Sequence, residues 1–255
     1  MVAAKTSEEG KPEPEKKEGE ERPKFDKKAL LSDALYFGIK GIGGSILKAL
    51  TDLKVDGQER IPIRGKAILT TISKNVFQDM LVISQLTGRK VHFMLHPKIM
   101  KHQVAGPILK TIGMIRGTEN KDDTEPVDKV FEILNEIGDL VALTPEAKLD
   151  RETQVKSMAG IIKFACAGNA PIIPLIVYGV KTKLFNLIPA KGLRVKIGKP
   201  IEVDKKLNRD KFRDQRYQLA EEILKIIEAL RPVETNGEKE IKREESQNGE
   251  NKGLY

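Results

Sequence analysis

The sequence contains no tryptophan, a single cysteine and few aromatic residues, and each scarcity excludes a class of protein. Phe, Trp and Tyr make up 5% of the 255 residues, too few for the aromatic platforms on which single-stranded nucleic acids stack. Cys166 stands alone, so no intrachain disulfide can form, which fits a reducing compartment. We therefore expect no nucleic-acid partner and a cytoplasmic location.

Long hydrophobic runs are also missing. No uncharged apolar stretch reaches the length that a bilayer span requires, and charged residues interrupt the N-terminal region from Lys5 onward, so we expect neither a transmembrane span nor a signal peptide. The chain has no Cys-x-x-Cys pair, no clustered metal-ligand spacing and no Walker A loop. We therefore expect no metal and no bound cofactor.

The charge is distributed unevenly along the chain. The formal net charge is +8; residues 1–24 carry −1 and residues 233–255 carry −2, which leaves +11 on residues 25–232. Both end segments are rich in Glu and Lys and poor in apolar residues, so we expect them to be disordered tails. A basic body favours an anionic partner, such as phosphate groups or an anionic membrane surface, although a generic solvated surface explains the charge equally well.

Between the tails, segments typical of strands alternate with segments typical of helices. Strands are predicted at 67–72, 90–95, 140–144, 171–178 and 193–198, and helices at 76–86, 97–112, 126–137, 156–167 and 209–230. This alternation predicts a single α/β domain over residues 25–232, with a mostly parallel central sheet flanked by helices. Ligands of such sheets bind beyond the carboxyl ends of strands, which directs attention to 73–79 and 144–151.

Residues 25–54 precede this pattern and are helical in character. Ile42, Ile46 and Leu47 recur at helical spacing, but three glycines around residue 43 weaken the middle. We predict a pair of short helices joined by a hinge. This N-terminal helix pair either packs on the core or forms an amphipathic layer at a membrane surface, with lysines such as Lys40 at the head groups.

Several short motifs stand at the ends of predicted strands, among them Ser73-Lys-Asn-Val-Phe-Gln-Asp79, Thr144-Pro-Glu-Ala-Lys-Leu149 and Gly198-Lys-Pro200. Their order resembles that of the glycerolipid acyltransferases, the lysophosphatidic acid acyltransferase family. The similarity runs from about Val55 to Pro200. Segment 73–79, Ser-Lys-Asn-Val-Phe-Gln-Asp, stands where the family has Asn-His-x-Ser-x-x-Asp; segment 144–149, Thr-Pro-Glu-Ala-Lys-Leu, stands where it has Phe-Pro-Glu-Gly-Thr-Arg. The resemblance implies a glycerol-3-phosphate acyltransferase-like fold. It also implies transfer of an acyl group from a thioester on coenzyme A or acyl carrier protein to a lysophospholipid-type acceptor.

The sequence departs from the family pattern at the position of the catalytic residue. The resemblance places the catalytic pair at Lys74 and Asp79, but the family's general base is a histidine. Lysine has an unperturbed pKa of about 10.4, so only about one side chain in a few thousand is neutral at pH 7. Lys74 either forms an ion pair with Asp79 that keeps the local geometry without catalysis, or acts as a base after desolvation lowers its pKa. The nearby carboxylate favours the first alternative.

Substrate-binding residues are also implied by the resemblance rather than by composition. They are Arg116, after the second block, and Pro145, Glu146, Lys148 and Arg151 in and after the third. Leu149 replaces the arginine that binds the acceptor phosphate in the family. Either Lys148 or Arg151 supplies the positive charge from a neighbouring position, where a lysine lacks the two-pronged geometry of a guanidinium, or both are ordinary exposed basic residues.

Three hypotheses for function remain open at this stage. The chain is an atypical active acyltransferase of phospholipid metabolism, a catalytically degenerate protein that binds lipid or acyl chains at a membrane surface, or an interaction protein that recruits partners through its charged tails. The lysine at position 74 favours the second hypothesis over the first.

Overall fold

The computed structural model describes residues 27–120, 122–180 and 191–232. The two predicted tails lie outside the described residues. Seven described strands form one sheet in the order β1-β7-β6-β2-β5-β3-β4. The strands are β1 (Lys54–Asp56), β2 (Ala67–Thr70), β3 (Val91–Leu95), β4 (Ile115–Arg116), β5 (Leu140–Ala142), β6 (Ile172–Val180) and β7 (Lys191–Ile197).

Every strand pair is parallel except β6 and β7, which are antiparallel. The predicted, mostly parallel sheet is confirmed. Strands β2 and β5 are fully buried, as expected for central strands of a parallel sheet that is covered on both faces. Their register, with Leu69 opposite Ala142, brings the segments that follow them to the same edge of the sheet.

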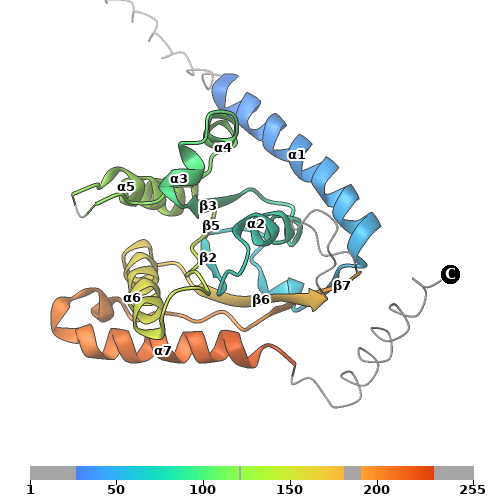
Figure 1. Ribbon diagram of the computed structural model, residues 1–255. Coiled ribbons are helices and arrows are strands. Elements are labelled where there is room, and N and C mark those ends of the chain that lie inside the picture. Colours follow the sequence, from blue (N-terminus) through green and yellow to red (C-terminus); the bar gives the residue numbers. More distant parts are fainter. Residues whose placement is uncertain (1–26, 121, 181–190, 233–255) are drawn as a thin grey trace, which may run out of the picture.

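Helices cover both faces of the sheet and make a three-layer α/β domain (Figure 1). One apolar core contains residues from α1 (Lys27–Thr51), α2 (Val76–Gln85), α3 (Pro97–Met100) and α4 (Ala105–Thr111). The other contains residues from α5 (Glu125–Phe131), the π-helical turn η2 (Glu132–Ile137), α6 (Arg151–Gly168) and α7 (Arg213–Ala229). Short 3₁₀ turns lie at η1 (Gln58–Arg60), η3 (Lys205–Asn208) and η4 (Asp210–Phe212).

The predicted N-terminal helix pair is wrong, because α1 is one continuous helix of 25 residues. Its glycines serve close packing instead of a hinge. A side-chain carbon added at Gly43 would lie 2.7 Å from Leu81, and one added at Gly44 would overlap Gln85. Both partners belong to α2, so the missing side chains allow α1 and α2 to approach closely.

Polar contacts also fasten α1 to the body. Lys40 donates to the carbonyl oxygens of Thr87 and Arg89, and the buried Tyr36 hydroxyl accepts from the Val91 amide at 3.0 Å. Lys90 donates to Ser32 at 2.8 Å. The prediction that Lys40 faces lipid head groups is therefore wrong, because its ammonium donates to carbonyl groups in the loop after α2. Partial burial lowers the pKa of this ammonium.

Candidate functional site

The candidate site forms where the segments after β2 and β5 meet. Backbone hydrogen bonds join them beyond the strands: Ser73 donates to the Pro145 carbonyl at 2.9 Å, and Ala147 donates to the Ser73 carbonyl at 2.7 Å. Ser73 and Glu146 form a parallel bridge. Segments 73–79 and 144–151, to which the sequence directed attention, therefore meet beyond the ends of β2 and β5, with Pro145 buried and Glu146 half-buried.

The chain turns from β2 into α2 through Asn75, which caps the helix. The Asn75 side chain accepts from the Gln78 amide at 3.2 Å, a standard way of satisfying an amide of the first turn. This cap places Asp79 one turn into α2, on the face that carries the buried Val82 and Ile83. Local sequence thus fixes the aspartate toward the sheet.

Asp79 is buried and receives a hydrogen bond from a serine. The Ser73 hydroxyl donates to Asp79 Oδ2 at 2.6 Å, and the two residues are 4% and 8% exposed. Burial raises the pKa of the Asp79 carboxyl to about 6, while the hydrogen bond from Ser73 acts in the opposite direction. A carboxyl with such a pKa changes protonation close to physiological pH.

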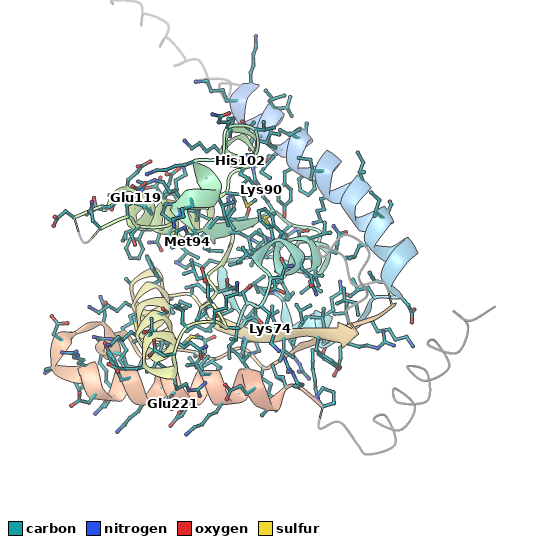
Figure 2. The ribbon with its side chains drawn as sticks, viewed as in Figure 1. Lys74, Lys90, Met94, His102, Glu119 and Glu221 are labelled. Atoms are coloured by element: carbon teal, nitrogen blue, oxygen red, sulfur yellow. The ribbon has the colours of Figure 1, made fainter. Side chains whose placement is uncertain are left out.

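Lys74 lies between these two residues in the sequence, but its side chain is exposed. Lys74 is labelled in Figure 2. The Asp79 carboxylate accepts a hydrogen bond from Ser73; burial raises the pKa of this carboxyl, and the bond from Ser73 lowers it. An ion pair between Lys74 and Asp79 stays a prediction, as does the catalytic role of either residue.

Comparisons with known proteins agree with this geometry. The model of the family described as Acyltransferase matches residues 52–178, which include both segments. The chain belongs to the acyltransferase family. Among solved structures, the fold is similar to the 1-acyl-sn-glycerophosphate (LPA) acyltransferase PlsC of Thermotoga maritima, with a TM-score of 0.58 and 15% sequence identity. The alignment covers 83% of this chain and 86% of that one. No curated protein matches the sequence significantly.

Two arginines named from the sequence already hold carboxylates in this acyltransferase-family protein. Arg116 binds Asp123 through both terminal nitrogens, at 2.6 and 2.9 Å, and Glu125 at 2.8 Å; these carboxylates raise the pKa of the guanidinium. Arg151 binds Glu221 at 2.9 Å and Glu228 at 2.6 Å, both on α7. Neither charge is uncompensated, and their substrate-binding role stays a prediction.

The sheet order also separates Arg116 from the two meeting segments. Strand β4 is three positions from β2 in the sheet, which corresponds to roughly 14 Å at the usual strand spacing. Lys148, by contrast, is exposed on the loop that follows Glu146. The buried Gln154 side chain supports this loop by donating to the Leu149 carbonyl at 3.0 Å.

The histidines of this acyltransferase-family protein have structural partners elsewhere. The buried His92 places Nδ1 2.7 Å from the Gly113 carbonyl oxygen. His96 accepts from the Lys98 amide at 3.1 Å, and His102, labelled near α4 in Figure 2, accepts from the amides at the start of that helix. No histidine takes the position of Lys74.

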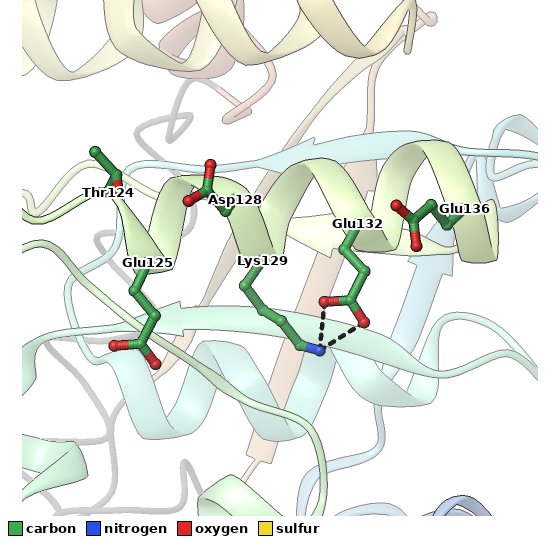
Figure 3. A pocket seen from close by; sticks show the side chains of 6 residues that line it. All are labelled: Thr124, Glu125, Asp128, Lys129, Glu132 and Glu136. Atoms are coloured by element: carbon green, nitrogen blue, oxygen red, sulfur yellow. Dashed lines mark hydrogen bonds and ion pairs between the residues drawn. The ribbon is translucent and has the colours of Figure 1, made fainter.

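A separate surface hollow lies along α5 and is mainly acidic. Figure 3 shows its lining, which consists of Thr124, Glu125, Asp128, Lys129, Glu132 and Glu136. The Lys129 ammonium binds both carboxylate oxygens of Glu132, at 2.7 and 2.8 Å. This hollow contains none of the residues predicted from the sequence, and its charge is unsuited to a phosphorylated ligand.

Sequence reasoning missed Ser73 and Gln154 as parts of the site. Ser73 was recognisable only as a hydroxyl six residues before Asp79, a spacing that has no general meaning without the turn after β2. Within the described residues, no group of three or more His, Cys, Asp or Glu is placed to hold a metal ion, and no described helix is long and apolar enough to cross a membrane.

Proposed function

We propose that this protein binds an acyl thioester and a lysophospholipid-type acceptor at the carboxyl edge of β2 and β5. It transfers the acyl group slowly, without the histidine general base of its family. The observation that carries this proposal is the Ser73–Asp79 hydrogen bond of 2.6 Å next to an exposed Lys74. Family membership supports the acyl chemistry, and the altered pair supports the reduced rate.

The physical reason for a reduced rate is the replacement of the family's histidine by a lysine. Lysine as a residue type has a pKa of about 10.4, far above that of histidine, and is therefore the poorer acceptor of a hydroxyl proton near neutral pH. General-base assistance contributes about 10²–10⁴-fold to such reactions. Coenzyme A or acyl carrier protein supplies the thioester in this proposal, and no other cofactor takes part. If transfer is absent altogether, the remaining function is binding of lipid or acyl chains.

The same proposal places the protein on an anionic membrane surface through α1. The outer side of this helix exposes large apolar residues, with Leu31 63% and Ile42 68% exposed. They lie eleven residues, or three helical turns, apart, so they share one stripe along the helix. Such a stripe on a basic body is typical of helices that lie in the membrane interface. Phospholipid acceptors reside in that interface.

Acyl transfer tests the catalytic part of the proposal. The full-length chain is assayed with acyl-coenzyme A and lysophosphatidic acid, beside Lys74→His and the double variant Lys74→His/Leu149→Arg. We expect slow transfer by the wild type and a gain of about 10²-fold or more in the double variant, because it restores both a base near neutral pH and a phosphate-binding arginine. Rapid wild-type transfer that rises with a lysine pKa above 7 would contradict the proposal.

Vesicle sedimentation tests the membrane part. Leu31→Ser/Ile42→Ser is compared with Ile226→Ser, a matched control on α7 whose side chain is 39% exposed. We expect binding to anionic vesicles to fall in the α1 variant and to persist in the control. Binding should also weaken with salt, because basic residues near an anionic leaflet contribute about 1 kcal/mol each. Equal binding by the two variants would exclude α1 as the contact.

A further inference from the structure

Ser73 and Asp79 form a hydroxyl–carboxylate pair at the centre of the proposed site. The hydroxyl donates to Asp79 Oδ2 at 2.6 Å, within the range of short, charge-assisted O–H···O⁻ bonds. Ser73 is also fixed from the other side, because its backbone amide and carbonyl are both bonded to segment 145–147. The pair is therefore held between two structural elements, in an arrangement that suits a nucleophile or proton carrier next to a base.

We propose that Ser73 and Asp79 act as a proton relay that serves the slow acyl transfer of this chain in place of a histidine. The inference rests on the proposed function and assigns its remaining general base. Asp79 is the proton acceptor, and the Ser73 hydroxyl conducts the proton from the acceptor to the carboxylate. Lys74, exposed beside them, takes no proton.

The relay accounts for every atom of the transfer. The acceptor oxygen attacks the thioester carbonyl as its proton passes to Ser73 Oγ, while the original Ser73 proton passes to Asp79 Oδ2. The new carbon–oxygen bond forms, the carbon–sulfur bond breaks, and the thiolate leaves. Return of the proton from Asp79 through Ser73 to the thiolate regenerates the starting state, so no oxidant, reductant or further reactant is required.

The electrostatics of the pair agree with this role. Burial raises the pKa of Asp79 to about 6, closer to operating pH than an exposed carboxyl and thus better suited to a general base. The other charged side chains of segments 73–79 and 144–151 are the exposed Lys74, Lys148 and Asp150 and the half-buried Glu146 and Arg151. Arg151 is paired with Glu221 and Glu228 of α7. The same hydrogen bond in a purely structural role would affect folding but not the rate-determining proton transfer.

The test measures binding and transfer separately on the full-length chain. Binding is followed with a non-hydrolysable thioether analogue of acyl-coenzyme A, and kcat of transfer to lysophosphatidic acid is measured from pH 5 to 8. The variants are Asp79→Asn, Ser73→Ala and Ser73→Thr. The matched control is Ser84→Ala, because Ser84 lies on the same helix and donates to the Leu81 carbonyl, away from the site.

We expect Asp79→Asn and Ser73→Ala to lower kcat by about 10²-fold or more, with analogue binding unchanged. Ser73→Thr keeps the hydroxyl and should retain most of the rate, and Ser84→Ala should match the wild type. Wild-type kcat should rise through a midpoint near pH 6. Circular dichroism confirms that each variant is folded; should Ser73→Ala fail to fold, the Thr variant and the pH midpoint carry the test.

Other outcomes separate the two proposals. Binding of the analogue with unchanged transfer in Ser73→Ala and Asp79→Asn would overturn the relay and leave the proposed function standing. Binding without any transfer above the uncatalysed rate would also overturn the relay, and would leave a binding protein. A chain that neither binds the analogue nor transfers the acyl group would overturn the proposed function itself.

Discussion

Replacing Asp79 with asparagine is expected to stabilise the domain at neutral pH. The pKa of Asp79 rises from 3.8 to about 6 on folding, mainly because burial disfavours the charged carboxylate. One pKa unit corresponds to about 1.4 kcal/mol, so the ionised side chain costs the folded state about 3 kcal/mol at pH 7. Asparagine has nearly the same shape and can still accept from Ser73, so most of that cost should disappear.

The effect should depend on pH in a defined direction. Below about pH 4 the carboxyl is protonated in both the folded and the unfolded chain, and the substitution should change little. As the pH rises from about 4 to 6, the unfolded chain releases its proton before the folded one does, and wild-type stability falls relative to the variant. Above about pH 6 the difference should reach a plateau.

Urea denaturation and thermal unfolding, both followed by circular dichroism at pH values from 4 to 8, measure this difference. In a domain of this size about 1 kcal/mol shifts Tm by roughly 2–4 °C, so the variant should melt several degrees higher at pH 7. A variant that is less stable than the wild type at pH 7, or a stability difference independent of pH, would refute the argument that the buried, ionised carboxylate destabilises the folded state.

Two further predictions concern α1 and α4. A side-chain carbon at Gly41 meets nothing within 4 Å, so Gly41→Ala should stabilise α1 by about 0.5–1 kcal/mol. Gly106→Ala should instead destabilise the domain by about 1–3 kcal/mol, because the new carbon overlaps the Met100 carbonyl. Urea denaturation of both variants measures the contrast. Tyr36→Phe should cost about 1–3 kcal/mol, since the buried Val91 amide loses its partner, and an unchanged midpoint would show that water replaces the hydroxyl.

Much of the fold was predictable because the central strands are short, buried and separated by helical segments. The strands that escaped prediction are β1 and β4, of three and two residues. Such strands are too short to show a periodic pattern, and only their neighbours in the sheet define them. The predicted helix at 97–112 is divided into α3 and α4, because the chain turns between Lys101 and Val104.

The candidate site was predictable at the level of segments but not of side-chain partners. The rule that ligands bind beyond strand ends singled out segments 73–79 and 144–151, and the sheet order brings them together. The hydrogen bond from Ser73 to Asp79 depends on the turn after β2. The two carboxylates that bind the Arg151 guanidinium belong to α7, about 70 residues further along the chain. Local sequence carries no signal for such pairings, since they arise only when the layers are assembled.

The glycine-mediated contact between α1 and α2 has a mechanical consequence. Gly43 and Gly44 bring the two helices together, Gln85 of α2 donates to the Lys40 carbonyl at 2.9 Å, and α2 is the helix that carries Asp79. The outer helix α1 and the helix of the site, α2, are therefore packed directly against each other. If α1 rests on a bilayer, its depth sets the height and tilt of the carboxyl edge above the leaflet, and lipids would be met while still seated among their neighbours.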